Sequence, residues 1–198
     1  MRITGGLARS IVLDVPQNMG VRPATDFTRE QIFNRIASKI VGAQVLDCCA
    51  GTGAYGLEAL SREAKHITFI EKNIRVARLI QCNCDKICKS IQKEPQLCTK
   101  IFTADVFRFD FSILNVKFDY IFFDPPYFFW EEYKNSIYEL LKKWAKEYPA
   151  TTLVIEYPSQ FVWPTLIPWG PIYPTKTSSK VNSPTINLFV HKNRSESA

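Results

Sequence analysis

The stretch Gln44-Val45-Leu46-Asp47-Cys48-Cys49-Ala50-Gly51-Thr52-Gly53-Ala54-Tyr55-Gly56 decides the fold class of this chain. Its apolar first half predicts a short buried strand, and the helical pattern of residues 57–62 predicts a helix after it. The glycines between them form a G-x-G-x-x-G turn, which lets the backbone turn tightly and approach a ligand closely. Such a turn fits NAD, FAD or S-adenosylmethionine equally well when it is taken alone.

Strands and helices alternate along the rest of the chain. We expect strands at residues 66–71, 98–102, 118–123, 152–157 and 185–190, and helices from about 26, from 73 to 90 and from 131 to 146. This alternation predicts an α/β fold, a Rossmann-like sheet that is mostly parallel, with helices on both faces. Six of the twelve prolines lie between Pro158 and Pro184. A long helix is excluded there, so we expect an antiparallel C-terminal hairpin strand, and residues 1–23 predict a short N-terminal β-hairpin arm.

Length and composition narrow the class of protein. The 198 residues are 46% hydrophobic and carry a net charge of +6, as in an ordinary globular domain. No apolar run reaches the roughly 18 residues that span a membrane, and residues 1–6 lack the apolar core of a signal peptide. We therefore expect a cytoplasmic protein with six free cysteines. Because no cysteine pair has C-x2-C spacing, we expect no metal site.

The charge is unevenly distributed along the chain. Residues 72–100 hold seven basic and two acidic side chains, whereas residues 43–71 and 101–150 are each net acidic. Segregated positive charge favours a polyanionic partner such as nucleic acid on one side of the protein. A solvated basic helix face is the alternative interpretation.

Three carboxylates distinguish between the cofactors. Asp47 stands immediately before the glycines, where it would repel the pyrophosphate of a dinucleotide but favour the ammonium of S-adenosylmethionine. Glu71 ends the second predicted strand, where a carboxylate accepts hydrogen bonds from ribose hydroxyls. Asp105 follows the third predicted strand and can accept from the adenine amine, or can simply cap a helix. Together they favour S-adenosylmethionine over NAD.

The sharpest local motif is Asp124-Pro125-Pro126-Tyr127, directly after the apolar run of residues 120–123. In a parallel sheet this places the motif at the carboxyl edge, where ligands bind. The Asp124 carboxylate and the Pro125 carbonyl would accept both hydrogens of an exocyclic amine and aim its lone pair at a methyl group. Tyr127 would stack on the base. The alternative is a Pro-Pro turn in an aromatic core that also holds residues 122, 123 and 130.

The chain resembles class I S-adenosylmethionine-dependent methyltransferases and, more narrowly, the RsmD-type small-subunit (16S) rRNA (guanine-N2) methyltransferases. The residues that carry the resemblance are Met1-Arg2-Ile3, Gly6, Arg9, Leu13, Pro16, Arg22-Pro23-Ala24-Thr25-Asp26, Arg29-Glu30, Phe33-Asn34, Val45-Leu46-Asp47, Ala50 to Ala54, Gly56 to Arg62, Phe69 to Lys72, and Asp124 to Tyr127. The family's basic arm is replaced here by Ser10-Ile11-Val12 and Asp14. The tail at residues 173–180 lacks the expected Tyr-Gly-x-Thr run.

The resemblance implies a role for each matched residue. S-adenosylmethionine would be bound by Asp47, Gly51, Thr52, Gly53, Glu71, Lys72, Asp105, Arg22 and Thr25. The guanine amine would be presented by Asp124, Pro125, Pro126 and Tyr127, and RNA would be contacted by Arg2, Arg9, Arg22 and Arg29. Residues 1–23 would be an RNA-contacting arm and residues 24–198 the methyltransferase domain. The expected partner is small-subunit rRNA or an assembled 30S-type subunit, and the expected state is a monomer without metal or membrane attachment.

The same motifs are compatible with other functions. The Asp-Pro-Pro-Tyr motif also suits DNA adenine-N6 and protein glutamine-N5 methyltransferases. A non-catalytic RNA-binding or ribosome-assembly module on the same fold is a third alternative, and an NAD dehydrogenase is the least favoured. For RNA, the basic side chains expected to follow the backbone are Lys72, Arg75, Arg78, Lys86 and Lys89.

Overall fold

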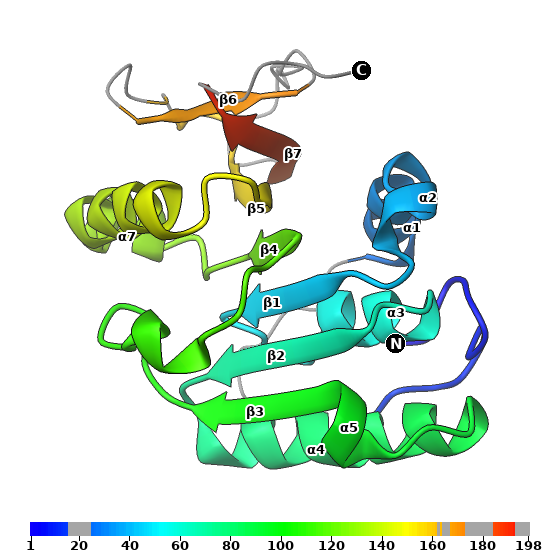
Figure 1. The fold of residues 1–198 in the computed structure, drawn as a ribbon. Coiled ribbons are helices and arrows are strands. Elements are labelled where there is room, and N and C mark those ends of the chain that lie inside the picture. The colour runs from blue at the N-terminus through cyan, green and yellow to red at the C-terminus, as the bar shows by residue number, and fades with distance from the viewer. Residues whose placement is uncertain (16–24, 162, 164–166, 173–183, 193–198) are drawn as a thin grey trace. The chain divides into compact units, whose positions relative to one another are not determined.

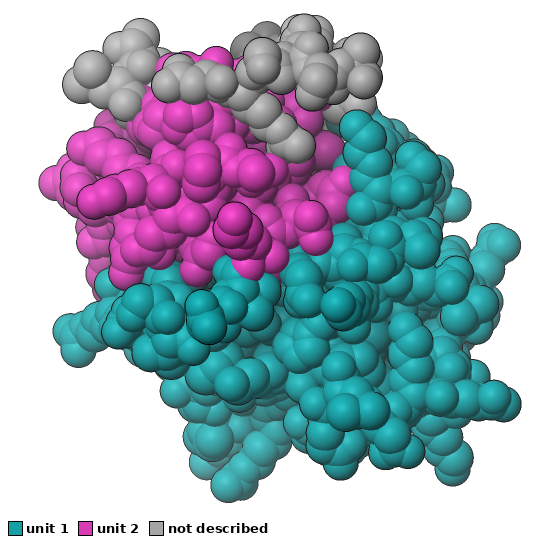
Figure 2. All heavy atoms as spheres, in the orientation of Figure 1, with its two compact units in different colours: residues 1–116 teal, residues 117–198 magenta. Residues whose placement is uncertain are grey.

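The computed structural model describes residues 1–15, 25–161, 163, 167–172 and 184–192. The chain divides into two compact units, Met1–Val116 and Lys117–Ala198, which Figure 2 shows in teal and magenta. The elements of the first unit are α1 (Asp26–Arg35), α2 (Ala37–Ile40), β1 (Gln44–Cys48), α3 (Ala54–Ser61), β2 (His66–Glu71), α4 (Ile74–Ser90), α5 (Pro95–Cys98), β3 (Thr99–Thr103) and the 3-10 helix η1 (Phe111–Leu114). Those of the second unit are β4 (Tyr120–Phe123), α6 (Phe129–Glu132), α7 (Lys134–Glu147), β5 (Thr152–Pro158), β6 (Trp169–Pro171) and β7 (Pro184–His191).

In the first unit, three parallel strands run in the order β3-β2-β1 (Figure 1). Asp47 of β1 pairs in register with Phe69 of β2, and Glu71 at the end of β2 pairs with Thr103 at the end of β3. The carboxyl ends of the strands therefore meet at one edge. The core beneath them is apolar, with α3 packed on β1 and β2 and α4 on β3.

The sequence pattern of helix α4 is strong enough to predict its position. Its buried residues recur at helical spacing and form a single face, namely Val76, Ala77, Ile80, Asn83, Cys84, Ile87 and Cys88. Asn73 caps the helix by accepting a hydrogen bond from the backbone N–H of Arg75 at 2.9 Å. A cap followed by an amphipathic run of this length specifies a helix over the predicted residues.

The N-terminal arm pairs with itself and is fastened to the first unit. Arg2 forms an antiparallel bridge with Val12, as the hairpin prediction expects. The arm is held to α3 because Thr4 donates from its backbone N–H and its hydroxyl to the two oxygens of Glu58, at 2.9 and 2.7 Å. It is held to α4 by Asp14 and Asn83, which exchange backbone-to-amide hydrogen bonds of 2.9 Å. Residues 16–23 of the predicted arm lie outside the described residues.

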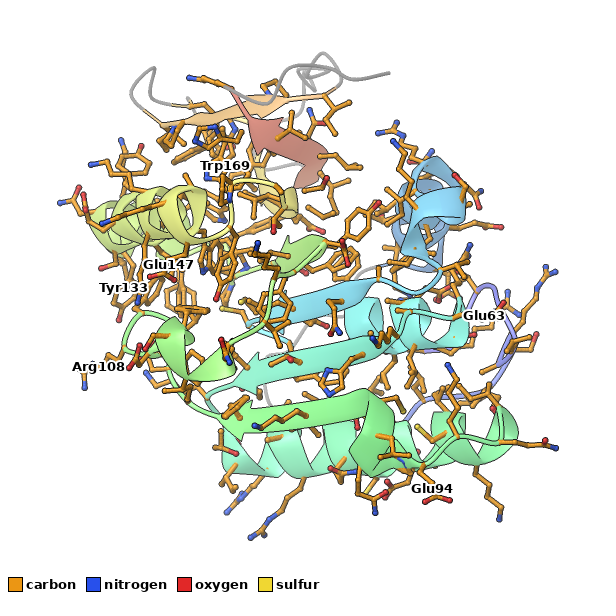
Figure 3. The ribbon with its side chains drawn as sticks, in the orientation of Figure 1. Glu63, Glu94, Arg108, Tyr133, Glu147 and Trp169 are labelled. Atoms are coloured by element: carbon orange, nitrogen blue, oxygen red, sulfur yellow. The ribbon has the colours of Figure 1, made fainter. Side chains whose placement is uncertain are left out.

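In the second unit, β4 and β5 are parallel and β7 is antiparallel to both β5 and β6, in the order β4-β5-β7-β6. The buried core beneath is aromatic: the rings of Phe123 and Trp144 meet edge-on with centroids 5.4 Å apart. Trp169, labelled in Figure 3, donates its indole N–H to the carbonyl oxygen of Leu141 in α7 at 2.8 Å. The prediction that Phe122, Phe123 and Trp130 are core residues is confirmed.

The predicted fold class is confirmed: the strands are mostly parallel, with an antiparallel C-terminal pair and helices packed around them. Four short elements, α2, α5, η1 and β6, were missed. The helix expected at residues 131–146 is wrong in its start, because Tyr133 (φ −114°, ψ 24°) leaves helical geometry and separates α6 from α7. The division into residues 1–23 and 24–198 stays a prediction.

No helix in the described ranges is long and apolar enough to cross a bilayer. Within the same ranges, no group of three or more His, Cys, Asp and Glu side chains is arranged to hold a metal ion. All six cysteines are free thiols.

Candidate active site

The glycine-rich turn between β1 and α3 depends on left-handed backbone conformations. Cys49, Gly51 and Gly53 have φ values of +57°, +54° and +74°. A Cβ on Gly53 would also stand 3.2 Å from Leu57 and 3.3 Å from Ile80, so both the conformation and the space favour glycine there. The turn therefore brings the backbone itself, rather than side chains, to the carboxyl edge of the strands.

The third glycine has a packing role. A Cβ on Gly56 would lie 2.3 Å from Cε1 of Phe69, a fully buried ring on β2. Its absence allows α3 to approach β2 closely, as the third glycine of such turns does in general. Gly56 also donates its backbone N–H to Oδ2 of Asp47 at 2.8 Å.

Asp47 is a buried carboxyl group with an unusual proton affinity. Its residue is 2% exposed, and burial raises its pKa from 3.8 to about 8, against the lowering effect of the Gly56 N–H and with a further rise from the charge of Glu71. A carboxylate in that position would gain from a neighbouring cation, which would favour its ionised form. This fits the predicted proximity of Asp47 to an ammonium group, which stays a prediction.

Glu71 joins the glycine turn to the end of β2. Its Oε2 accepts from the backbone N–H of Gly51 at 2.9 Å, and its Oε1 accepts from the N–H of Asn73 at 2.8 Å. Each carboxylate oxygen can accept more than one hydrogen bond, so these contacts leave capacity for ribose hydroxyls. Sequence reasoning predicted the ligand role of Glu71 but missed that it also holds the turn in place.

Asp105 and Lys72 form an ion pair at the same edge. The distance between Lys72 Nζ and Asp105 Oδ2 is 2.9 Å, and Oδ1 accepts from the N–H of Phe107 at 3.0 Å. Burial alone would raise the pKa of Asp105, but the hydrogen bonds of Lys72 and Phe107 and the charges of Lys72 and Arg108 outweigh it and lower the pKa. Asp105 is thus an ionised acceptor beside Glu71, which suits an amine donor.

The two threonines predicted to bind cofactor have structural contacts. Thr25 caps α1, since its Oγ1 accepts from the backbone N–H of Thr28 at 3.1 Å. Thr52 is buried, and its hydroxyl lies 3.8 Å from the sulfur of Met1. Their cofactor contacts stay predictions, and Arg22 lies outside the described residues.

The arginines predicted to contact RNA fall into two groups. Arg2 and Arg9 are exposed, and Arg2 lies 3.3 Å (Nε–Oδ2) from Asp26. Arg29 is buried, and its contact with RNA stays a prediction. Its Nη2 donates to the carbonyl oxygen of Arg2 at 2.6 Å and to Asp26 Oδ1 at 2.7 Å, so its hydrogen-bonding groups face the protein interior.

In the second unit, Asp124 to Tyr127 directly follow β4. Pro125 is buried, whereas Asp124 and Tyr127 are partly exposed. The carbonyls of Pro126 and Tyr127 accept from the N–H groups of Phe129 and Trp130, at 2.8 and 3.1 Å, which makes the turn compact. The prediction that the motif lies at a strand end is confirmed, and its catalytic role stays a prediction.

Sequence reasoning missed a partner of this motif. The hydroxyl of Tyr127 donates to Oε1 of Glu156 on β5 at 3.0 Å. Phe123 pairs in register with Ile155, so Glu156 follows at the same carboxyl edge as Asp124. The available signal was a lone carboxylate in an otherwise apolar strand. The bond restrains the direction of the Tyr127 side chain.

Comparisons with known proteins give a consistent result. The model of the family described as "Conserved hypothetical protein 95" matches residues 1–183. The curated Ribosomal RNA small subunit methyltransferase D of Escherichia coli K12 is 37% identical over 127 residues, which is 64% of this chain and 60% of that protein. The match thus spans less than two thirds of the relative.

Solved structures agree on the fold. The Escherichia coli protein yhhF superposes with a TM-score of 0.72 at 28% identity, covering 96% of this chain and 97% of the other. SMU.776, solved in complex with SAH, has a TM-score of 0.60 at 12% identity and covers 81% of this chain and 48% of the other. At that identity the second likeness concerns the fold alone.

Proposed function

We propose a function from the premise that the chain belongs to the family described as Conserved hypothetical protein 95, whose model covers nearly all of it. The chain transfers a methyl group from S-adenosylmethionine to the exocyclic N2 amine of a guanine in small-subunit rRNA. The observation that carries the proposal is the Asp124-Pro125-Pro126-Tyr127 turn at the end of β4 in a chain 37% identical to a protein named as a small-subunit rRNA methyltransferase. Such a substrate would place the protein in the cytoplasm, where ribosomal subunits assemble.

The polar groups of the first unit fit S-adenosylmethionine better than a dinucleotide. Glu71 and Asp105 offer carboxylate oxygens at one edge, for ribose hydroxyls and the adenine amine. Asp47, whose carboxyl group interacts electrostatically with Glu71, would ionise beside an ammonium group and would oppose a pyrophosphate. The Gly51–Gly53 backbone would lie against the cofactor. When bound, S-adenosylmethionine supplies a methyl group on a positively charged sulfur that is ready for displacement.

The second unit would present the acceptor amine. The Asp124 carboxylate and the Pro125 carbonyl accept the two amine hydrogens, which draws the nitrogen lone pair out of conjugation and toward the methyl carbon. Tyr127, oriented by Glu156, stacks on the guanine. A methylated amine would have one proton to release, and the carboxylate of Asp124, which would hold that amine, would accept the proton or pass it to solvent. The chain's contribution is positioning and electrostatic stabilisation.

Substitution of Asp124 tests the proposal. Asp124→Asn keeps the size of the side chain but removes one acceptor and its charge. We expect methyl transfer from labelled cofactor to unmethylated small-subunit rRNA to fall by roughly 100-fold or more, while the dissociation constant of the cofactor is nearly unchanged. The matched control is Asp119→Asn, an exposed aspartate just before β4, which should keep full activity.

Two outcomes would contradict the assignment. Equal loss of transfer and of cofactor binding in Asp124→Asn would show that Asp124 serves the cofactor and not the amine. Label in DNA adenine or in a protein glutamine, with none in rRNA, would replace the substrate by one of the other amines that this motif can present.

A further inference from the structure

Helix α4 carries a stripe of positive charge along its exposed side. The stripe, which we call the cationic face, consists of Arg75, Arg78, Lys86 and Lys89, with Cys82 at its centre. Successive spacings of three, four, four and three residues place these five side chains on one side of a helix. Figure 3 shows long nitrogen-tipped side chains projecting from α4 away from the strands.

The cationic face is opposite the buried face of α4. Residues such as Ile80, Cys84 and Ile87 pack against the strands and are fully buried, whereas every member of the stripe is exposed. The face therefore contributes no core packing. From Arg75 to Lys89 it extends about 21 Å along the helix, at 1.5 Å per residue, which is long enough to meet several nucleotides of a strand.

Most of this charge is not neutralised within the protein. Among the described residues, no carboxylate lies within ion-pair distance of Arg75, Arg78 or Lys89. Lys86 is the exception, with its Nζ 2.6 Å from Oδ2 of Asp14. Asp85, on the flank of the stripe, accepts from the Gln81 amide at 2.9 Å. Three unpaired cations on a rigid helix make a preformed surface for phosphate groups.

The stripe begins next to the residues of the first unit that we expect to bind the cofactor. Asn73 caps α4 and donates its backbone N–H to Oε1 of Glu71, whose other oxygen accepts from the N–H of Gly51. Arg75 is thus in the first helical turn after that edge, and the stripe leads away from it. A strand of RNA laid along α4 would have one end at the edge where the cofactor is expected.

From this geometry we propose that the cationic face of α4 is the surface that binds the RNA phosphodiester backbone. This rests on the proposed function for the identity of the polyanion, and it deepens that function by assigning the contact surface. The proposal assigns the RNA contact to exposed residues of α4 and not to Arg29, which is buried. The contacts are electrostatic, so they position the RNA without reading its sequence.

A double substitution with a matched control tests the surface. Arg78→Gln/Lys89→Gln removes two unpaired charges, and Lys142→Gln/Lys146→Gln removes two exposed charges from α7. Binding of an unmethylated small-subunit rRNA transcript is measured across a salt series. In the α4 variant we expect the slope of log affinity against log salt to shrink by about 1.4 and the affinity to fall roughly tenfold. The α7 variant should keep the wild-type slope; equal slopes in all three proteins would overturn the proposal.

The thiol of Cys82 can report whether RNA covers the cationic face. Cys82 is exposed at the centre of the stripe, whereas Cys48, Cys84, Cys88 and Cys98 are buried. Alkylation by N-ethylmaleimide, followed by mass spectrometry on the unmodified wild-type sequence, should slow severalfold at Cys82 when the transcript is bound. An unchanged rate at Cys82 with RNA bound would overturn the proposal.

Protection of Cys82 tests the RNA-binding surface, and methyl transfer tests the proposed reaction, so the two can fail independently. Protection of Cys82 without any methyl transfer would support the surface and contradict the reaction. Methyl transfer to RNA without protection of Cys82 would support the reaction and contradict the surface.

Discussion

The guanidinium of Arg29 lies 3.7 Å (Nε–Oε2) from the carboxylate of Glu58, and both side chains are buried. Arg62 approaches the other oxygen of Glu58 at 2.9 Å, and Thr4 donates to both. The group joins α1, α3 and the arm through one buried carboxylate. An arginine that sequence comparison suggests for RNA binding thus serves to assemble the first unit.

Breaking this pair should destabilise the protein. Arg29→Met leaves the Glu58 carboxylate with Arg62 and Thr4 but without its second cation, and it removes the bonds of Arg29 to Arg2 and Asp26, so we expect the free energy of unfolding to fall by about 1–3 kcal/mol. Urea unfolding followed by fluorescence measures it, with Arg9→Met, an exposed arginine of the arm, as the control that should change little. A variant as stable as wild type would show that Arg29 does not hold the interior together.

Asp47 should make stability depend on pH. Its pKa is about 8 in the folded chain against an ordinary value of 3.8, so between these values the folded state binds a proton that the unfolded state has released. The free energy of unfolding contributed by this group therefore falls as pH rises from about 4 to about 8. Asp47→Asn, neutral throughout, should flatten that part of the profile. An unchanged pH profile of urea unfolding in the variant would contradict the raised pKa.

Gly56→Ala should be destabilising through a single methyl group. The added Cβ would meet the Phe69 ring at 2.3 Å, and forcing α3 and β2 apart should cost about 1–3 kcal/mol. Gly170→Ala is the matched control, because its Cβ would meet only Cγ of Lys192, at an ordinary 3.5 Å. Thermal or urea unfolding of both variants measures the difference. Equal stabilities would mean that α3 and β2 are not in close contact.

The ring and the hydroxyl of Tyr127 should make separable contributions to methyl transfer. Tyr127→Phe keeps the stacking face but loses the bond to Glu156, so we expect a small loss of kcat/KM. Tyr127→Ala also loses stacking, worth roughly 1–3 kcal/mol, so kcat/KM should fall about 5- to 150-fold. Steady-state transfer to rRNA measures both. An equal loss in the two variants would show that the hydroxyl, and not the ring, carries the function.

Elements with strong periodicity were predictable from the sequence. Helix α4 was expected over residues 73–90 and occupies Ile74–Ser90, because its buried side chains recur every three or four residues. The strand β6, Trp169–Pro171, was missed because three residues that include a glycine and a proline carry no periodic signal. The break at Tyr133 is a local conformation within a continuous helical pattern, so the pattern did not reveal it.

The candidate site was predictable where its residues are close in sequence. The glycine turn and the Asp124–Tyr127 turn each follow a strand, so local pattern located them. Pairings between distant residues were not predictable: Glu58 with Arg29, or Glu156 with Tyr127, depends on register and packing that one sequence does not display. The burial of Arg29 is the clearest case, since the family resemblance implied a contact with RNA and did not indicate the pairing with Glu58.

Identification of the methylated nucleoside tests the central claim most directly. Small ribosomal subunits from cells that lack this protein are incubated with it and with methyl-labelled S-adenosylmethionine, alongside naked unmethylated rRNA and unmethylated DNA. The nucleosides are then separated and identified by mass spectrometry. Our account predicts label in N2-methylguanosine of small-subunit rRNA. Label in N6-methyladenine, or no label in any RNA while the cofactor is shown to bind, would contradict it.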